Sequence, residues 1–145
     1  MSGETHRAQY AALPFRRRGP MIEVLLITSR DTGRWVIPKG WPIAGLSPRE
    51  SAAREAYEEA GLVGQVTDQP IGRFHYDKRL DDGSSVSCAV EVFALEVEEQ
   101  MPTWLEQDER QTRWFDLAEA AAAVQERDLQ GLILGLAGRL GGRPR

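Results

Sequence analysis

The sequence has little of what marks several specialised classes of protein. A single cysteine, Cys88, rules out a disulfide within the chain, as is usual in a reducing compartment. The longest aliphatic run, at 21–27, is too short to cross a bilayer and contains Glu23. An excess of basic residues is also missing, because 18 Lys and Arg stand against 22 Asp and Glu, for a net charge of −4. We therefore expect a cytoplasmic protein whose partners include neither a nucleic acid polymer nor a membrane.

Internal repeats and low-complexity linkers are absent as well. A length of 145 residues suits one domain around one core. Hydrophobic residues make up 41% and charged residues 28% of the chain, which is ordinary for a globular protein. We expect a single domain over residues 1–145, with flexible ends at about 1–6 and 141–145. The composition leaves monomer and homodimer equally open.

Apolar and β-branched runs predict a sheet. The expected strands are 8–16, 21–28, 35–37, 71–80, 85–97 and 111–115. The sequence Asp81-Asp82-Gly83 predicts a hairpin turn, and Cys88 lies in an alternating strand pattern, as a small core residue would. Two late helices are expected, at 117–124 after a cap at Asp116 and at 129–140 after a cap at Asp128. Strands with helices interposed late favour a mixed β-sheet covered by helices, of the α/β (α+β) class.

The best-marked helix spans residues 48–60. Ser47 is a favourable N-cap, Pro48 suits the first helical position, and Glu50 completes a capping box. Gly61 suits the C-terminal stop. Alanines occupy one arc of the helix and would let it lie close to a sheet; they are Ala52, Ala53, Ala56 and Ala60.

Three carboxylates crowd the second half of this helix. Glu55, Glu58 and Glu59 lie at i, i+3 and i+4, so they repel one another unless a cation lies among them. The helix dipole also disfavours negative charge there. Carboxylate oxygens suit Mg²⁺ or Mn²⁺. A solvated Glu-rich face is the alternative, and composition alone does not separate the two. Arg54, four residues before Glu58, is placed to orient that carboxylate.

The residues around the helix resemble a known signature. Gly40, followed at the right spacing by the run REAYEEAGL at 54–62, resembles the Nudix box, and WVIPKG at 35–40 resembles the strand and turn that lead into it. The order of elements is similar to the Nudix α/β/α sandwich with its mixed sheet. Segments 15–16, 23–30 and 110–124 resemble the branch that hydrolyses diphosphoinositol polyphosphates and diadenosine polyphosphates. One position departs from the box, because Leu46 stands where its first Glu is expected.

The resemblance implies a pyrophosphohydrolase that uses Mg²⁺ or Mn²⁺ on a small phosphorylated substrate. Metals bound by the helix carboxylates would screen phosphate charge and acidify a water. Glu58 and Glu59 are implied as ligands, Glu55 as a ligand or the general base, and the Lys39 carbonyl as a further ligand. Arg54 joins Glu55 and Glu58 in the implied catalytic set. A further acid is expected from another strand or loop, with Glu106, Glu109 and Glu91 as the candidates.

Arginine and lysine side chains are the expected contacts to substrate phosphates, since guanidinium forks match phosphate oxygens. The candidates are Arg16, Arg18, Arg30, Lys39 and Arg110. Two alternatives stay open. A Nudix-like module could bind a nucleotide or phosphorylated ligand without turnover, which the substitution at Leu46 favours. The acidic helix could also be a structural element at a protein interface.

Overall fold

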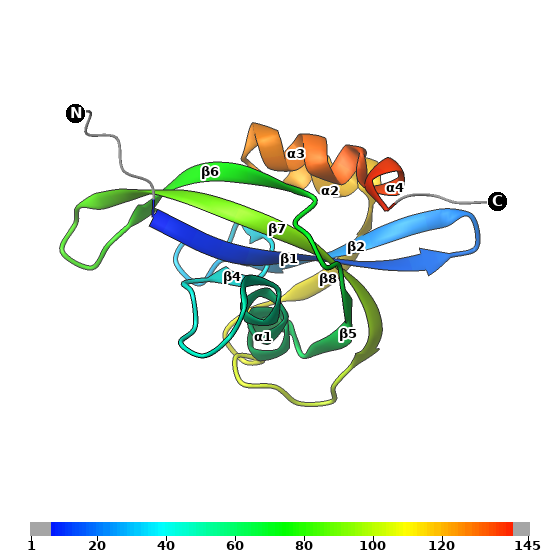
Figure 1. Ribbon diagram of the computed structural model, residues 1–145, viewed down its shortest axis with the longest axis horizontal. Helices are drawn as coiled ribbons and strands as arrows, with labels where there is room; N and C mark the ends of the chain where they lie inside the picture. Colours follow the sequence, from blue (N-terminus) through cyan, green and yellow to red (C-terminus); the bar gives the residue numbers. More distant parts are fainter. Residues whose placement is uncertain (1–6, 141–145) are drawn as a thin grey trace.

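The computed structural model describes residues 7–140. The flexibility expected for residues 1–6 and 141–145 concerns positions outside this range. Eight strands form one sheet (Figure 1). They are β1 (Arg7–Arg18), β2 (Met21–Thr28), β3 (Trp35–Val36), β4 (Lys39–Gly40), β5 (Leu62–Val66), β6 (Gly72–Arg79), β7 (Ser85–Gln100) and β8 (Thr112–Asp116).

The sheet is mixed, as expected. Its main path runs β3-β2-β1-β7-β5, with β4 paired to β1, β6 to β7 and β8 to β2. The central pair, β1 and β7, is parallel from Arg7 opposite Cys88 to Phe15 opposite Glu96, whereas its neighbours are antiparallel. The first strand of the chain therefore lies in the middle of the sheet.

Helices cover both faces of this sheet. α1 (Pro48–Ala60) lies on one face, and α2 (Leu117–Ala123), α3 (Arg127–Leu134) and α4 (Leu136–Arg139) lie on the other (Figure 1). Each face has its own buried cluster: Phe93 and Leu95 of β7 point toward α1, and Val90 and Val92 point toward the late helices. Because strand side chains alternate, one strand serves both cores. The predicted α/β/α sandwich is confirmed.

The local signals for α1 are confirmed. Ser47 accepts a hydrogen bond from the Glu50 backbone while the Glu50 side chain accepts one from the Ser47 backbone, which is a complete capping box. Gly61 ends the helix with φ 70°, in the left-handed region. Ala52, Ala56 and Ala60 are fully buried against the sheet, as the small-residue face predicts.

Two local predictions need correction. Strand β5 was not expected, because Gly64 and Gln65 interrupt its apolar pattern. The Asp128 cap is wrong, since α3 begins at Arg127 with Glu126 in the N-cap position. The Glu126 carboxylate does not cap the helix and instead pairs with Arg34 at 2.8 Å. The long final helix is also divided, with a break at Gly135 between α3 and α4.

Across residues 7–140, no helix combines the length and the apolar character needed to span a bilayer. The only cysteine, Cys88, lies on β7 and is fully buried in the core cluster on the side of the late helices, as expected for a small packing residue.

Candidate active site

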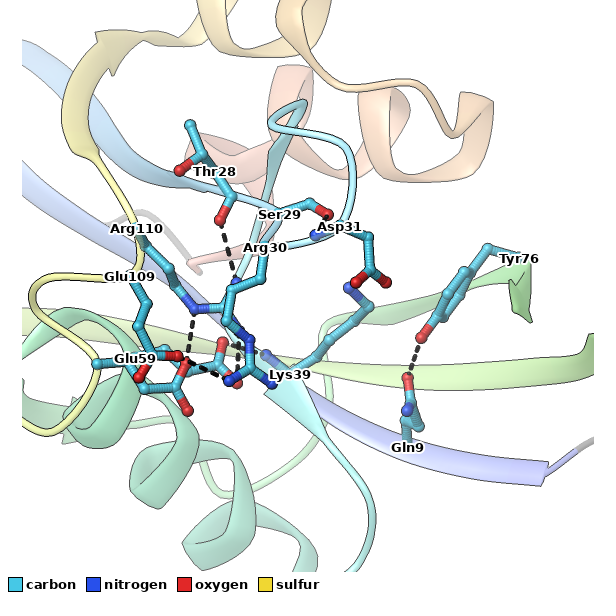
Figure 2. A network of polar contacts seen from close by, with 11 residues as sticks. Gln9, Thr28, Ser29, Arg30, Asp31, Lys39, Glu59, Tyr76, Glu109 and Arg110 are labelled. Carbon is cyan, nitrogen blue, oxygen red and sulfur yellow. Dashed lines mark hydrogen bonds and ion pairs between the residues drawn. The ribbon is translucent and has the colours of Figure 1, made fainter. Parts of the chain in front are cut away.

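A cavity of about 870 Å³ brings several distant segments together. Its lining comes from the start of β1, the loop after β2, the β3–β4 segment, α1, β6 and the loop before β8. Among the residues expected in a site, it gathers Glu55, Glu59, Glu106, Arg30, Lys39 and Arg110. Figure 2 shows Glu59, Lys39 and Arg110 close together, with Tyr76 and Gln9 farther along.

Glu55 enters this cavity through a close approach to Gly40. A Cβ added at Gly40 would lie 2.5 Å from the Cδ and from one carboxylate oxygen of Glu55. Only glycine leaves room for a carboxylate there, which gives a physical reason for the first letter of the box. The strand β4 and the helix α1 are thus fitted together at these two residues.

Glu59 is the most buried carboxylate of the cavity, with 6% of its surface exposed. Its Oε1 accepts a hydrogen bond from the Lys39 backbone N–H at 3.4 Å, and its Oε2 lies 3.8 Å from Arg110 Nη2. Burial raises the pKa of Glu59 to about 8, against the opposing effect of Arg110, and the adjoining Glu55 carboxylate raises it further. Burial also raises the pKa of Glu55. Burial therefore disfavours the charged form of both carboxylates.

Arg110 holds the acidic end of the cavity together from the loop before β8. Its Nε donates to Glu106 Oε1 at 2.8 Å, and its Nη1 donates to the Thr28 carbonyl at 3.0 Å. The Glu106 backbone N–H donates to the Glu58 carbonyl at 3.0 Å, which fastens the loop to the end of α1. Of the candidate acids expected outside α1, Glu106 is the one that shares the cavity with Glu55 and Glu59.

Arg30 and Glu109 form a second link across the same opening. Arg30 Nη1 donates to Glu109 Oε1 at 2.8 Å, with both side chains about half exposed. Arg30 lines the cavity, whereas Glu109 is outside its lining. Of the two loop acids expected, Glu106 is therefore the better placed.

Lys39 reaches from the carboxylates toward β6. Its ammonium lies 4.9 Å from the centre of the Tyr76 ring, a cation–π distance. Burial lowers the pKa of Lys39 to about 8, and Glu59 partly opposes this. The Tyr76 hydroxyl in turn donates to Gln9 Oε1 at 2.6 Å.

Two predicted members of the α1 set lie elsewhere. Glu58 is half-buried but outside the cavity lining, although its charge helps to raise the pKa of Glu55. Arg54 is exposed and lines a separate hollow of about 350 Å³ together with Leu46. Their spacing predicts that all three glutamates lie close together on α1, but only Glu55 and Glu59, at i and i+4, line the cavity beside β4.

Three further predicted residues also lie outside the cavity lining. Arg16 and Arg18 lie near the β1–β2 turn and pair with Glu23, at 2.8 Å and 3.7 Å. Their strand enters the cavity at its other end, near Gln9. Glu91 pairs with Arg73 at 3.5 Å across β6 and β7. We therefore leave Arg16, Arg18 and Glu91 out of the site.

Several cavity residues were not anticipated. Gln9, Arg34, Tyr76 and Lys78 all line it. A signal for two of them was present, because Tyr76 and Lys78 share one face of β6 with the buried Phe74. Arg34 carried no comparable signal, since its position depends on a pairing with Glu126 that is 92 residues away.

The donor atoms of the acidic end fit a hard divalent cation. Glu55, Glu59 and Glu106 offer only oxygen, and Mg²⁺ takes one or two protein carboxylates and completes its shell with water and phosphate oxygens. Within residues 7–140, no three His, Cys, Asp or Glu side chains converge as a ready-made metal site. Burial raises the pKa values of Glu55 and Glu59, and a divalent cation bound beside them would offset that effect.

Comparison with known proteins agrees with this geometry. Residues 5–132 match the family described as NUDIX domain. Nudix hydrolase 13, mitochondrial, of Arabidopsis thaliana is 36% identical over 107 residues, covering 68% of this chain and 52% of the relative. Diphosphoinositol polyphosphate phosphohydrolase 3-alpha of Mus musculus is 29% identical over 128 residues, covering 84% of this chain and 71% of the relative.

Solved structures share the fold. A C. elegans Ap4A hydrolase binary complex superposes with a TM-score of 0.68 at 21% identity, covering 94% of this chain and 99% of that one. The NUDIX domain of Shewanella oneidensis NrtR complexed with ADP ribose superposes with a TM-score of 0.65 at 16% identity, covering 94% of this chain and 90% of that one. The chain spans about half the length of the first Arabidopsis relatives it matches. The domain match covers most of the chain and a relative exceeds 30% identity, so this protein belongs to the Nudix family.

Proposed function

We propose that this protein is a divalent-metal-dependent hydrolase of phosphoanhydride bonds in a small polyphosphorylated molecule. The substrate is of the dinucleoside polyphosphate or diphosphoinositol polyphosphate type. Relatives named Nudix hydrolase and diphosphoinositol polyphosphate phosphohydrolase support this class of activity. A cytoplasmic location and a monomeric or homodimeric state stay predictions.

The observation that carries the proposal is the pair Glu55 and Glu59 at one end of the cavity. Glu59 is buried and Glu55 is partly buried, and burial raises the pKa of both carboxylates. A structural role would be served better by neutral side chains, because burying two adjoining acids costs free energy. A bound cation would offset this cost by neutralising the two carboxylates.

Glu55 and Glu59 would hold Mg²⁺ or Mn²⁺, with Glu58 and the Lys39 carbonyl assigned by the signature. Such an ion, when bound, supplies charge neutralisation for phosphate oxygens and acidifies a water. Arg110 and Arg30 lie beside these carboxylates and would bind phosphate oxygens of the substrate. Glu106, held by Arg110, is the candidate to accept a proton from the attacking water.

A module that binds without turnover is the second candidate, because Leu46 replaces a glutamate of the signature. Leu46 lies in the smaller hollow with Arg54 and Tyr57, and not in the cavity that holds Glu55 and Glu59. The substitution therefore removes no carboxylate from the proposed site, and hydrolysis is the better supported function.

The test is phosphate release from a panel of nucleoside diphosphate derivatives, dinucleoside polyphosphates and diphosphoinositol polyphosphates, with and without Mg²⁺ or Mn²⁺. We expect metal-dependent hydrolysis of at least one compound and a loss of about 100-fold or more in Glu59→Gln, since a metal ligand is removed.

Glu50→Gln is the matched control. It removes the same charge from the same helix, and glutamine still completes the capping box. Hydrolysis that needs no metal, or that falls equally in both variants, would reject the mechanism. Ligand binding without hydrolysis across the whole panel would favour the binding module.

A further inference from the structure

The end of the cavity opposite the carboxylates is basic. Arg34, Lys39 and Lys78 all line it. They come from the segment before β3, from β4 and from β6, so the fold brings together cations that the sequence separates. Lys39 lies between the two ends: its backbone contacts Glu59 and its ammonium lies over Tyr76.

Two of these three cations form no direct ion pair with a carboxylate of the described residues. Within residues 7–140, no carboxylate oxygen lies within 4.0 Å of the ammonium of Lys39 or Lys78, whereas Arg34 pairs with Glu126 at 2.8 Å. The Arg34 guanidinium also has a buried nitrogen, Nη1, with no hydrogen-bond partner. All three side chains line the same cavity, and the Lys39 ammonium lies over Tyr76, which is two residues before Lys78 on the same face of β6.

The geometry of β6 aims Lys78 into the cavity. Phe74, Tyr76 and Lys78 alternate onto one face of the strand, where Phe74 is buried and Tyr76 contacts Lys39 and Gln9. Two acidic residues, Asp31 and Asp77, also line the cavity. Asp77 alternates to the other face of β6, and Asp31 is exposed in the loop after β2.

We propose that Arg34, Lys39 and Lys78 form a second anion subsite, which binds a phosphate group of the substrate beyond the anhydride that is cleaved. This inference rests on the proposed function. It narrows the substrate to molecules with phosphate at both ends of the cavity, such as a tetraphosphate-linked dinucleotide or a multiply phosphorylated ring. A sugar diphosphate derivative, whose only phosphates form the anhydride, leaves the subsite empty.

The two aromatic rings at this end of the cavity are not free to sandwich a nucleobase. The Tyr76 ring has a cation on it, and the Trp41 ring has the Arg7 guanidinium 5.0 Å from its centre. One face of each ring is therefore already covered by a side chain, so neither forms an open two-sided slot for a nucleobase. The chemistry that remains available at this end is that of ammonium and guanidinium groups, which bind phosphate.

The first arm of the test measures binding without turnover. Inorganic tripolyphosphate is titrated into the metal-free protein by calorimetry, comparing wild type, Lys78→Gln and Arg73→Gln. Arg73 is a matched control, because it lies on the same strand but outside the cavity, and its loss changes the net charge equally. We expect Kd to rise about tenfold or more in Lys78→Gln and less than about twofold in Arg73→Gln.

The second arm uses substrates. For compounds with a distal phosphate, Lys78→Gln should raise KM about tenfold with little change in kcat, whereas for a sugar diphosphate derivative neither constant should move. Thermal unfolding of each variant confirms that the fold is intact.

Equal binding by Lys78→Gln and Arg73→Gln, or no tripolyphosphate binding by wild type, would overturn the subsite. If wild type hydrolyses a compound of the panel but Lys78→Gln and Arg73→Gln bind tripolyphosphate equally well, only the subsite is rejected. Binding that depends on Lys78 but is accompanied by no hydrolysis of any compound rejects the proposed function alone.

Discussion

Gly40 and the Glu55 carboxylate lie so close that a methyl group at residue 40 would overlap the carboxylate. The atoms in the way are at the end of a flexible side chain. Glu55 can therefore move aside at small cost to the fold, but it then leaves its position in the cavity. A substitution at Gly40 should therefore lower activity without a large loss of stability.

We predict that Gly40→Ala lowers kcat/KM by about 100-fold, because Glu55 is displaced from the cation it would hold. The free energy of unfolding should change by less than about 1 kcal/mol. Steady-state kinetics and denaturant unfolding measure the two effects.

Gly131→Ala is the control for this variant. Gly131 lies on an exposed turn of α3, where an added Cβ meets no atom within 4 Å. Alanine should stabilise the helix by about 0.5–1 kcal/mol and leave kcat/KM unchanged. If Gly40→Ala keeps full activity, the close packing of Gly40 and Glu55 does not set the position of the carboxylate.

We predict that Gly61→Ala destabilises the fold by about 2–4 kcal/mol. Gly61 has φ 70°, which costs a residue with a Cβ about 1–2 kcal/mol, and its added Cβ would overlap the Trp104 ring. Trp104 belongs to the loop that carries Glu106, so a shift in tryptophan fluorescence and a fall in kcat/KM should accompany the loss of stability. Unaltered stability would mean that the ring moves aside freely.

We predict that Glu59→Gln raises the Tm of the metal-free protein at pH 8 by several degrees. Burial raises the pKa of Glu59 from 4.5 to about 8, so between these values the folded protein holds a proton that the unfolded chain has released. The stability contributed by the protonated acid is fully present below about pH 4.5 and is lost as the pH rises to about 8. Glutamine stays neutral, so the difference in Tm should be small at pH 5 and grow toward pH 8.

Thermal unfolding in a chelating buffer over this pH range measures the effect. A variant less stable than wild type at pH 8 would show instead that the contact with Arg110 outweighs the cost of burial.

We predict that Leu46→Glu changes kcat/KM by less than about threefold. Residue 46 lies in the small hollow with Glu50 and Arg54, away from the cavity carboxylates. Restoring the residue of the signature should therefore add no ligand to the site. A rise of tenfold or more, or a lower Mg²⁺ concentration at half-maximal activity, would contradict this separation.

Local signals predicted the parts of the fold that depend on neighbouring residues. Ser47, Glu50 and Gly61 determine where α1 begins and ends, because the groups that they satisfy lie within one turn. The cap at Asp116 is likewise present, where its side chain accepts from the Glu119 backbone. The predicted cap at Asp128 is wrong, because α3 begins one residue earlier, at Arg127, with Glu126 in the N-cap position. Nothing in the neighbouring sequence indicates that Glu126 pairs with Arg34.

The lining of the cavity could be predicted where it depends on one helix and less well where it depends on pairing across the sheet. Glu55 and Glu59 follow from their spacing on α1. Arg16 has the residue type of a phosphate contact, but the β1–β2 pairing places it beside Glu23. Lys78 joins the cavity because β6 pairs with β7, and that register is a long-range property of the sheet.

The parallel pairing of β1 with β7 has a consequence for synthesis. Residues 7–15 find their partners at 88–96, about eighty residues later in the chain. At about 5–20 residues per second on the ribosome, the first strand waits several seconds before the middle of the sheet can form. The β1–β2 hairpin can form early, but its free edge stays unpaired during this time. Until residues 88–96 are made, this edge exposes unpaired backbone N–H and C=O groups to other chains.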